Sequence, residues 1–192
     1  MTTAGLHHTL EEPFYVLATE NPIEMEGTYP LPEAQLDRFL YKVLVPFPVE
    51  NELLSILSRT TTEEMTRLKP VANRETIRSL MQLILQVPVA EPVLKFAAKL
   101  VLRTHPENEE APDFIRQYVR YGSSPRGAQA LILSAKIRAL REGRYNASVE
   151  DVTAQALPSL RHRLILNIEG QAENISTDSL LTQLLEKEHN KS

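Results

Sequence analysis

The stretch from Phe14 to Phe39 reads FYVLATENPIEMEGTYPLPEAQLDRF, and it combines a buried-strand pattern, a polar strand end and a charged helix. Its first five residues, Phe14 to Ala18, form an unbroken apolar run that is too short for most helices. Such a run predicts a strand buried on both faces, as in a parallel sheet covered by helices. In these sheets ligands bind beyond the carboxyl ends of the strands, so Asn21 is a candidate polar contact. The alternative is that Asn21 and Pro22 simply begin a turn.

A short helix is predicted from Pro32 to about Leu40, because proline suits the first turn of a helix. Its apolar residues share one face, and Arg38 points away from that face. Asp37 and Arg38 are sequence neighbours and do not face each other on a helix, so an internal ion pair does not account for the arginine. Arg38 could reach into a neighbouring subunit. The alternative is a solvated surface arginine.

The composition excludes several classes of site. The chain has 192 residues, of which 42% are hydrophobic and 24% charged, as in an ordinary globular protein. It has no cysteine, which excludes a disulfide framework, a thiolate metal site and a cysteine nucleophile. The five histidines match no metal-ligand spacing. A net charge of −4 gives no drive toward nucleic acid or anionic membrane. Neither a leader pattern nor 18 consecutive apolar residues occurs, so the cytoplasm is the expected compartment.

A change of pattern at Pro48 predicts an all-helical domain in the rest of the chain, because apolar residues then recur at helical spacing. The apolar stripes of these helices are expected to form a core. The expected helices run from Glu50 to about Arg67 with a break near Thr60, from Asn73 to Gln86, from Glu91 to about Thr104, from Asp113 to Tyr121, from Ser124 to Glu142, from Ser148 onward, over a short stretch around Arg161 to Arg163, and from Thr177 to Lys187.

The start of the helix at Ser124-Pro125-Arg126 has features of a phosphate site. Ser124 suits the N-cap position and Pro125 the first helical position. Arg126 then lies in the first turn, where the helix dipole repels a cation. Free backbone N–H groups together with a guanidinium at a helix start are typical of phosphate binding, which makes Arg126 a candidate phosphate ligand.

Three segments resemble the MoxR branch of the AAA+ ATPases. ATENP followed by EGTYPLPEAQLDRF is similar to the family's sensor 1 and arginine-finger region. GSSPRGAQALILSAKIRALREGRYNASVEDV, from Gly122 to Val152, is similar to the sensor 2 helix of its lid, and LPSLRHRL, from Leu157 to Leu164, matches a further segment. The resemblance implies an ATP-driven, ring-forming, chaperone-like remodelling ATPase.

The resemblance also implies roles for single residues. Asn21 would sense the γ-phosphate and orient the attacking water. Arg38 would be the finger given in trans to the next subunit, and Arg126 would be sensor 2, reaching from the lid to the nucleotide. Arg161 and Arg163 receive no firm role beyond an inter-helix or inter-subunit contact.

The sequence lacks the segments that hold nucleotide phosphates and magnesium in such enzymes. It contains no GxxxxGK[ST] loop and no apolar strand that ends in Asp-Glu. A second buried strand is predicted at Tyr41 to Phe47, but two strands and one short helix cannot bury a doubly wound sheet. The chain is therefore expected to be a C-terminal part of such an ATPase that does not hydrolyse ATP alone, unless its two strands pair unusually.

The expected fold class is mainly α, with residues 1–47 as a remnant of the α/β ATPase core and 48–192 as an all-helical lid. The expected cofactors are ATP and Mg²⁺, and the expected partners are other subunits of a hexameric ring and a client protein. Two alternatives stay open. One is a non-catalytic interaction module derived from a lid; the other is part of a related AAA+ helicase or chelatase subunit, of which the acidic charge balance disfavours the helicase.

Overall fold

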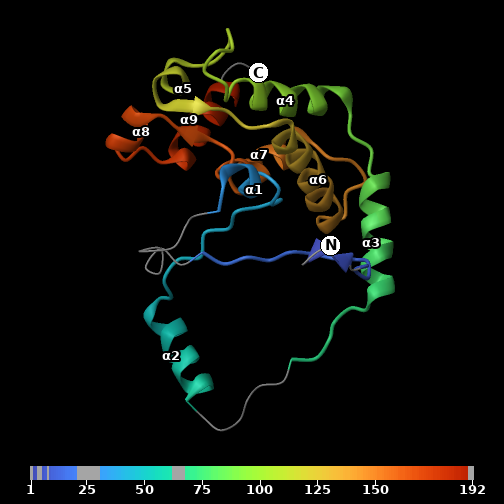
Figure 1. The fold of residues 1–192 in the computed structure, drawn as a ribbon. Coiled ribbons are helices and arrows are strands. Elements are labelled where there is room, and N and C mark those ends of the chain that lie inside the picture. The colour runs from blue at the N-terminus through green and yellow to red at the C-terminus, as the bar shows by residue number, and fades with distance from the viewer. Residues whose placement is uncertain (1, 4–5, 8, 21–30, 62–67, 190–192) are drawn as a thin grey trace. The chain divides into compact units, whose positions relative to one another are not determined.

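The computed structural model describes residues 2–3, 6–7, 9–20, 31–61 and 68–189 (Figure 1). The chain divides into two compact units, one made of Met1–Ala18 and Val43–Met81 and the other of Thr19–Lys42 and Gln82–Ser192. These units do not follow the boundary expected near residue 47, which refers to the two domains of the family and stays a prediction. Among the described residues, no helix has both the length and the apolar character needed to cross a bilayer.

The first unit contains little regular structure besides its helices. β1 (Thr2–Thr3) pairs with β2 (Leu6–His7) in antiparallel register. α2 spans Glu50–Thr60, and α3 spans Arg74–Gln86 and begins in this unit. α2 ends at Thr60, where a break was predicted, and Asn73 caps α3 by accepting a hydrogen bond from the Thr76 amide at 2.8 Å.

The two predicted buried strands are wrong for this structure. Phe14 to Ala18 forms no strand and is exposed, Leu17 to 97%. Residues 43–47 are likewise irregular, and most of their side chains are exposed. A strand is buried on both faces only where neighbouring strands pair with it and helices cover it. No described segment pairs with either run as a strand, and their apolar side chains stay exposed.

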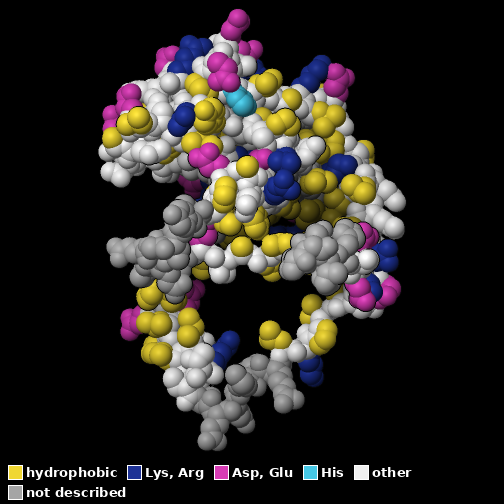
Figure 2. All heavy atoms as spheres, in the orientation of Figure 1, with side chains coloured by type: hydrophobic (Ala, Val, Ile, Leu, Met, Phe, Trp, Pro, Cys, Tyr) yellow, Lys and Arg dark blue, Asp and Glu magenta, His cyan; other side chains and the backbone are white. Residues whose placement is uncertain are grey.

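The apolar stripes of α2 and α3 are a second departure from expectation. Both helices form as predicted, but neither buries a residue. Figure 2 shows apolar side chains on the exposed surface of α2. The predicted core is therefore confined to the second unit, because helical periodicity creates an apolar face without providing its partner.

The second unit holds the remaining helices and a small two-stranded sheet. β3 (Val119–Tyr121) and β4 (Ile165–Leu166) pair antiparallel with an irregularity in register, and neither strand was predicted. A short helix after β4 was also not predicted, and residues 161–163 form a turn rather than a separate helix. The helices are α1 (Glu33–Leu36), α4 (Glu91–Leu102), α5 (Asp113–Tyr118), α6 (Pro125–Arg141), α7 (Val149–Leu160), α8 (Ile168–Ala172) and α9 (Thr177–His189).

The core of the second unit lies between α4, α6, α7 and α9, with α5 at its side. The most completely buried large apolar side chains come from all five of these helices, namely Leu100, Ile115, Leu131, Leu160, Leu180, Leu181 and Leu184. Burial of each such side chain contributes about 1.5–3 kcal/mol relative to exposure. The expectation of a mainly helical chain is confirmed.

Asp151 is a buried carboxylate that joins the ends of α6 and α7. Arg144 reaches it with two hydrogen bonds of 2.7 and 2.5 Å, and the Ser148 amide donates a third at 2.9 Å. The hydrogen bonds from Arg144, which outweigh burial, hold the pKa of Asp151 below its usual value. Asp151 thus completes the cap of α7 together with Ser148 and fixes the α6–α7 turn.

Candidate functional site

The first turn of α6 is built as the sequence predicts. Ser124 has extended backbone angles (φ −64°, ψ 169°), and its side chain accepts a hydrogen bond from the Arg126 amide at 3.2 Å. Pro125 occupies the first helical position. Arg126 therefore lies in the first turn, at the positive end of a 17-residue helix.

The loop before α6 is fixed by the end of α4. Thr104 Oγ1 accepts a hydrogen bond from the Ser123 amide at 2.9 Å, and His105 Nε2 lies 2.9 Å from the Ser123 carbonyl oxygen. A Cβ at Gly122 would lie 2.7 Å from the carbonyl carbon and oxygen of Thr104, so only glycine fits there. These contacts hold Ser124 and Arg126 at a defined place on the surface of the second unit.

Asp37, at the C-terminal end of α1, is the centre of the site. Ser124 Oγ lies 2.7 and 2.9 Å from the two carboxylate oxygens and donates its hydrogen bond to them. Arg126 Nη1 donates to Oδ2 at 2.9 Å, and Arg163 Nε donates to Oδ1 at 3.2 Å. Partial burial by itself would raise the pKa of Asp37, but the bonds from Ser124 and Arg126 and the charge of Arg163 together hold it below its usual value.

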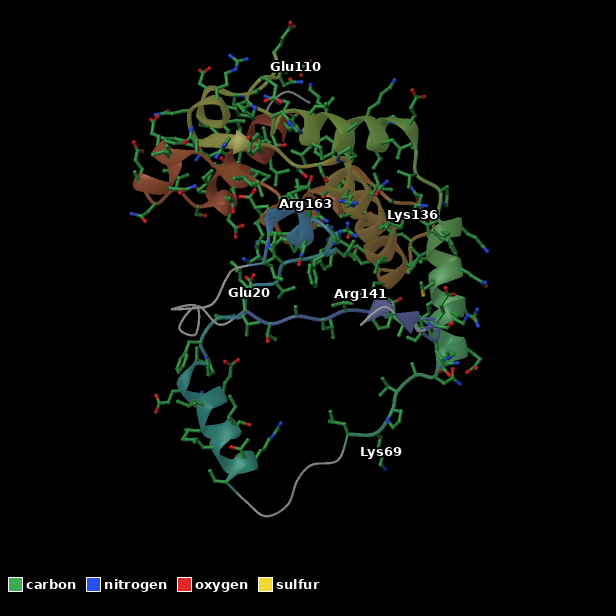
Figure 3. All side chains as sticks on the ribbon, viewed as in Figure 1. Glu20, Lys69, Glu110, Lys136, Arg141 and Arg163 are labelled. Atoms are coloured by element: carbon green, nitrogen blue, oxygen red, sulfur yellow. The ribbon has the colours of Figure 1, made fainter. Side chains whose placement is uncertain are left out.

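Arg163 is buried and holds the backbone that follows α1. Its Nη2 donates to the carbonyl oxygens of Asp37 at 3.0 Å and of Phe39 at 2.7 Å. Its Nη1 donates to the Leu40 carbonyl at 3.3 Å and also contacts the Ser159 carbonyl. Figure 3 shows Arg163 beside the α1 segment. All three guanidinium nitrogens thus have partners, and the peptide that carries Arg38 is held on both sides.

Residues near Arg163 in the sequence also hold the backbone of Lys42 by hydrogen bonds. Arg161 Nη1 donates to the Lys42 carbonyl at 3.2 Å, while its Nε pairs with Asp178 of α9 at 2.9 Å. The Lys42 amide donates to the Pro158 carbonyl at 2.9 Å. Arg161 and Arg163 therefore make contacts within the chain, in line with the inter-helix alternative.

His162 belongs to the same cluster. Its Nε2 donates to the Phe39 carbonyl at 3.0 Å, which requires a proton on that nitrogen, and Nδ1 is buried without a hydrogen-bond partner among the described residues. Burial lowers the pKa of His162 below its usual value, outweighing the contact with the carbonyl. The imidazole is therefore neutral in the folded chain near pH 7.

The three residues singled out from the sequence have different surroundings. Asn21 lies outside the described residues. Arg38 is exposed, and within the described part of the chain its side chain makes no hydrogen bond or ion pair. Arg126 is half exposed and bound to Asp37. The structure thus joins the element of Arg126 to the peptide of Arg38, and the roles of all three residues stay predictions.

Sequence reasoning missed Asp37, His162 and Arg163 as parts of one cluster. Asp37 was noticed only as a neighbour of Arg38, and Arg163 lies 126 positions further along the chain. The one available signal was the run of basic residues Arg161 to Arg163 directly after an apolar helix, which is an unusual place for two arginines without partners.

Chemically, the cluster pairs one carboxylate with two guanidinium groups at the start of a helix. Because Asp37 offsets only one of the two positive charges, the site keeps a net positive charge beside the N–H groups of the first turn of α6. Such surroundings favour an anion, and the half-exposed guanidinium of Arg126 is accessible to one.

Comparison with known proteins identifies the chain's relatives. Residues 1–41 match the ATPase family associated with various cellular activities (AAA), and residues 113–184 match the AAA lid domain. The crystal structure of a candidate ATPase from Cytophaga hutchinsonii superimposes with a TM-score of 0.88 at 34% identity, covering 97% of this chain and 57% of that one.

Two curated bacterial proteins are similar over nearly the whole chain. The uncharacterised protein YeaC of Bacillus subtilis is 34% identical over 96% of this chain and 55% of its own length. The chaperone MoxR1 of Mycobacterium tuberculosis is 31% identical over 97% of this chain and 49% of its own length. The chain thus spans about half the length of the curated relatives it matches. Its helical second unit contains the segment that matches the AAA lid domain, its first residues match the AAA family, and the chain belongs to the MoxR branch of the AAA+ ATPases.

Proposed function

We propose that this chain supplies the lid and the end of the ATPase core of a MoxR-type enzyme that couples ATP binding and hydrolysis to remodelling or assembly of partner proteins. Membership of the family supports ATP and Mg²⁺ as its cofactors. The proposal includes assembly into a hexameric ring in the cytoplasm, without nucleic acid as a partner.

Each predicted site residue has a role in this proposal. Asn21 orients the attacking water, and Arg38 reaches the nucleotide of the neighbouring subunit, where it stabilises charge on the transferred phosphoryl group. Arg126 contacts a phosphate of the nucleotide bound within the same subunit. Bound Mg-ATP would supply the γ-phosphoryl group, and the half-exposed guanidinium of Arg126 at the start of α6 fits a phosphate of the nucleotide in its own subunit.

One observation carries this proposal: the Asp37 cluster connects the peptide of Arg38 to the first turn of α6. Asp37 is hydrogen-bonded to both Ser124 and Arg126, and Arg163 holds the backbone on either side of Arg38. A displacement at Arg126 therefore has a direct structural route to the segment that carries the proposed finger. This is the connection that a ring needs if the nucleotide state of one subunit is to affect the next.

Binding of a fluorescent ATP analogue tests the assignment of Arg126. The analogue is titrated with Mg²⁺ into the wild-type chain, into Arg126→Ala and into Arg141→Ala. Arg141 is an exposed arginine in the last turn of the same helix and serves as the matched control. Weak saturable binding by the wild type and by Arg141→Ala is expected, with loss of binding in Arg126→Ala.

Circular dichroism of the three chains shows whether the fold is retained. Equal binding by wild type and Arg126→Ala, or an equal loss in both arginine variants, contradicts a specific phosphate contact by Arg126.

A further inference from the structure

The two arginines at Asp37 are held very differently. Arg163 is buried, and besides Asp37 it binds four backbone carbonyl oxygens, those of Asp37, Phe39, Leu40 and Ser159. Arg126 has a side chain that is 52% exposed, and its guanidinium makes one ion pair, through Nη1 to Asp37 at 2.9 Å. Within the described residues, Arg126 is therefore the partner that can leave without breaking any other hydrogen bond of its guanidinium.

The energies of the two contacts point the same way. A partly exposed ion pair contributes about 0–1 kcal/mol, because water screens it. A phosphate group carries more negative charge than a carboxylate and can accept two parallel hydrogen bonds from a guanidinium. A phosphate that reaches Arg126 thus competes well with Asp37, whereas Arg163 stays fixed by its carbonyl partners.

We infer that Asp37 is a built-in competitor for Arg126, whose guanidinium it holds until a phosphate group of a nucleotide takes its place. This inference rests on the proposed function, in which Arg126 binds phosphate. When Arg126 leaves, Asp37 keeps its bonds to Ser124 and Arg163 and remains next to Arg38. Ser124 and Arg126 are the two residues at the start of α6 that bind Asp37, and the exchange removes the contact of Arg126. Phosphate binding at Arg126 therefore loosens the segment that carries the proposed finger.

The competition has a measurable consequence, because a chain without the Asp37 charge should bind phosphate more tightly. Asp37→Asn keeps an oxygen that can accept from Ser124 and Arg163 but removes the negative charge. We expect this variant to bind inorganic tripolyphosphate roughly twofold to fivefold more tightly than the wild type in a calorimetric titration. Asp37→Glu keeps the charge and should bind with an affinity much nearer that of the wild type.

A double-mutant cycle separates this effect from a general change in charge. In an Arg126→Ala background, Asp37→Asn should change the phosphate affinity little, because the arginine for which Asp37 and phosphate compete is gone. Glu142→Gln, a carboxylate-to-amide change at the opposite end of α6, controls for net charge and should leave the affinity unchanged. A parallel titration with Mg-ATP tests whether the same gain applies to a nucleotide.

The outcomes distinguish the inference from the proposed function. If Arg126→Ala binds phosphate as the wild type does, the proposed function fails. If binding requires Arg126 but Asp37→Asn binds no more tightly than the wild type, the proposed function stands and the competition is refuted. Absence of binding by both the wild type and Asp37→Asn into the millimolar range also refutes it. A gain with tripolyphosphate that is absent with Mg-ATP rules out the nucleotide as the ligand.

Discussion

α2 and α9 are amphipathic helices of similar length, yet only α9 is part of a core. Each carries a leucine-rich stripe at helical spacing, and in α9 three leucines of that stripe, Leu180, Leu181 and Leu184, are completely or almost completely buried. In α2 the corresponding residues stay exposed, for example Leu57 to 49%. The difference lies in what surrounds each helix, since α9 contacts α7 and its stripe belongs to the buried core that α4, α6 and α7 also form.

The comparison separates helix formation from burial. Local signals such as apolar periodicity predict where a helix forms, and both helices form where this spacing predicts them. Most of the stability of a protein helix comes from packing its apolar face, which depends on distant parts of the chain. The following predictions test how far this contrast between the two units extends.

The largest expected effect is in the core of the second unit. Leu131→Ala removes a fully buried side chain of α6 and should lower the free energy of unfolding by about 2–5 kcal/mol, through lost transfer energy and the cavity left behind. Leu57→Ala in α2 is the matched control and should cost at most about 0.5 kcal/mol. Urea unfolding followed by circular dichroism measures both. Equal costs at the two sites contradict the contrast between buried and exposed stripes.

Arg163→Met should release the segment after α1 from the turn that follows α7. The change leaves several carbonyl oxygens without their guanidinium donor and removes one of the donors to the Asp37 carboxylate, at a cost of about 2–3 kcal/mol. Hydrogen exchange should become faster at the Lys42 amide, which donates to Pro158. Arg141→Met, at an exposed site, should leave exchange unchanged. Unaltered protection of Lys42 in the Arg163 variant shows that other contacts hold this segment.

Gly127→Ala should destabilise the chain although alanine is the better helix former. A Cβ at this position would lie 2.0 Å from Ser123 Oγ, 2.9 Å from Leu160 Cδ2 and 3.2 Å from Arg163 Cδ. Overpacking of this kind costs about 1–3 kcal/mol, which exceeds the gain in helix propensity. Thermal unfolding measures the effect, and an increase in melting temperature shows that α6 can shift to make room.

The smallest expected effect is a dependence of stability on pH through His162. Its pKa is lower in the folded chain than in the unfolded one, so between these two values the unfolded chain binds more protons. The contribution of His162 to the free energy of unfolding is fully present above the unfolded pKa near 6.5. It is lost as the pH falls from there through the folded pKa, by at most about 1.4 kcal/mol per pH unit. His162→Gln should flatten the stability profile between pH 6.5 and the folded pKa. A variant profile that parallels the wild type over this window assigns the dependence to other groups.

Much of the helical framework could be predicted from the sequence, and so could the part of the site that lies at the start of α6. The starts of α3, α6 and α7 lie where Asn73, Ser124 and Ser148 place them, and Arg126 lies in the first turn of α6. Whether the two apolar runs form buried strands could not be predicted in this way. An apolar run indicates its own tendency to form a strand, but not whether a neighbouring strand is present to pair with it. The pairing of Asp37 with Arg126 and Arg163 was also beyond prediction, since its members come from opposite ends of the chain.

The sequence by itself determined where the longer helices begin, several of their caps and the resemblance to a MoxR-type lid, because these depend on residues within a few positions of one another. Only the tertiary structure decided which apolar stripes are buried and which side chains bind the Asp37 carboxylate. Both depend on the path of the whole chain, which brings α1 against α6 and the turn after α7. Burial and ion pairing need two partners at contact distance, and a local pattern specifies only one of them.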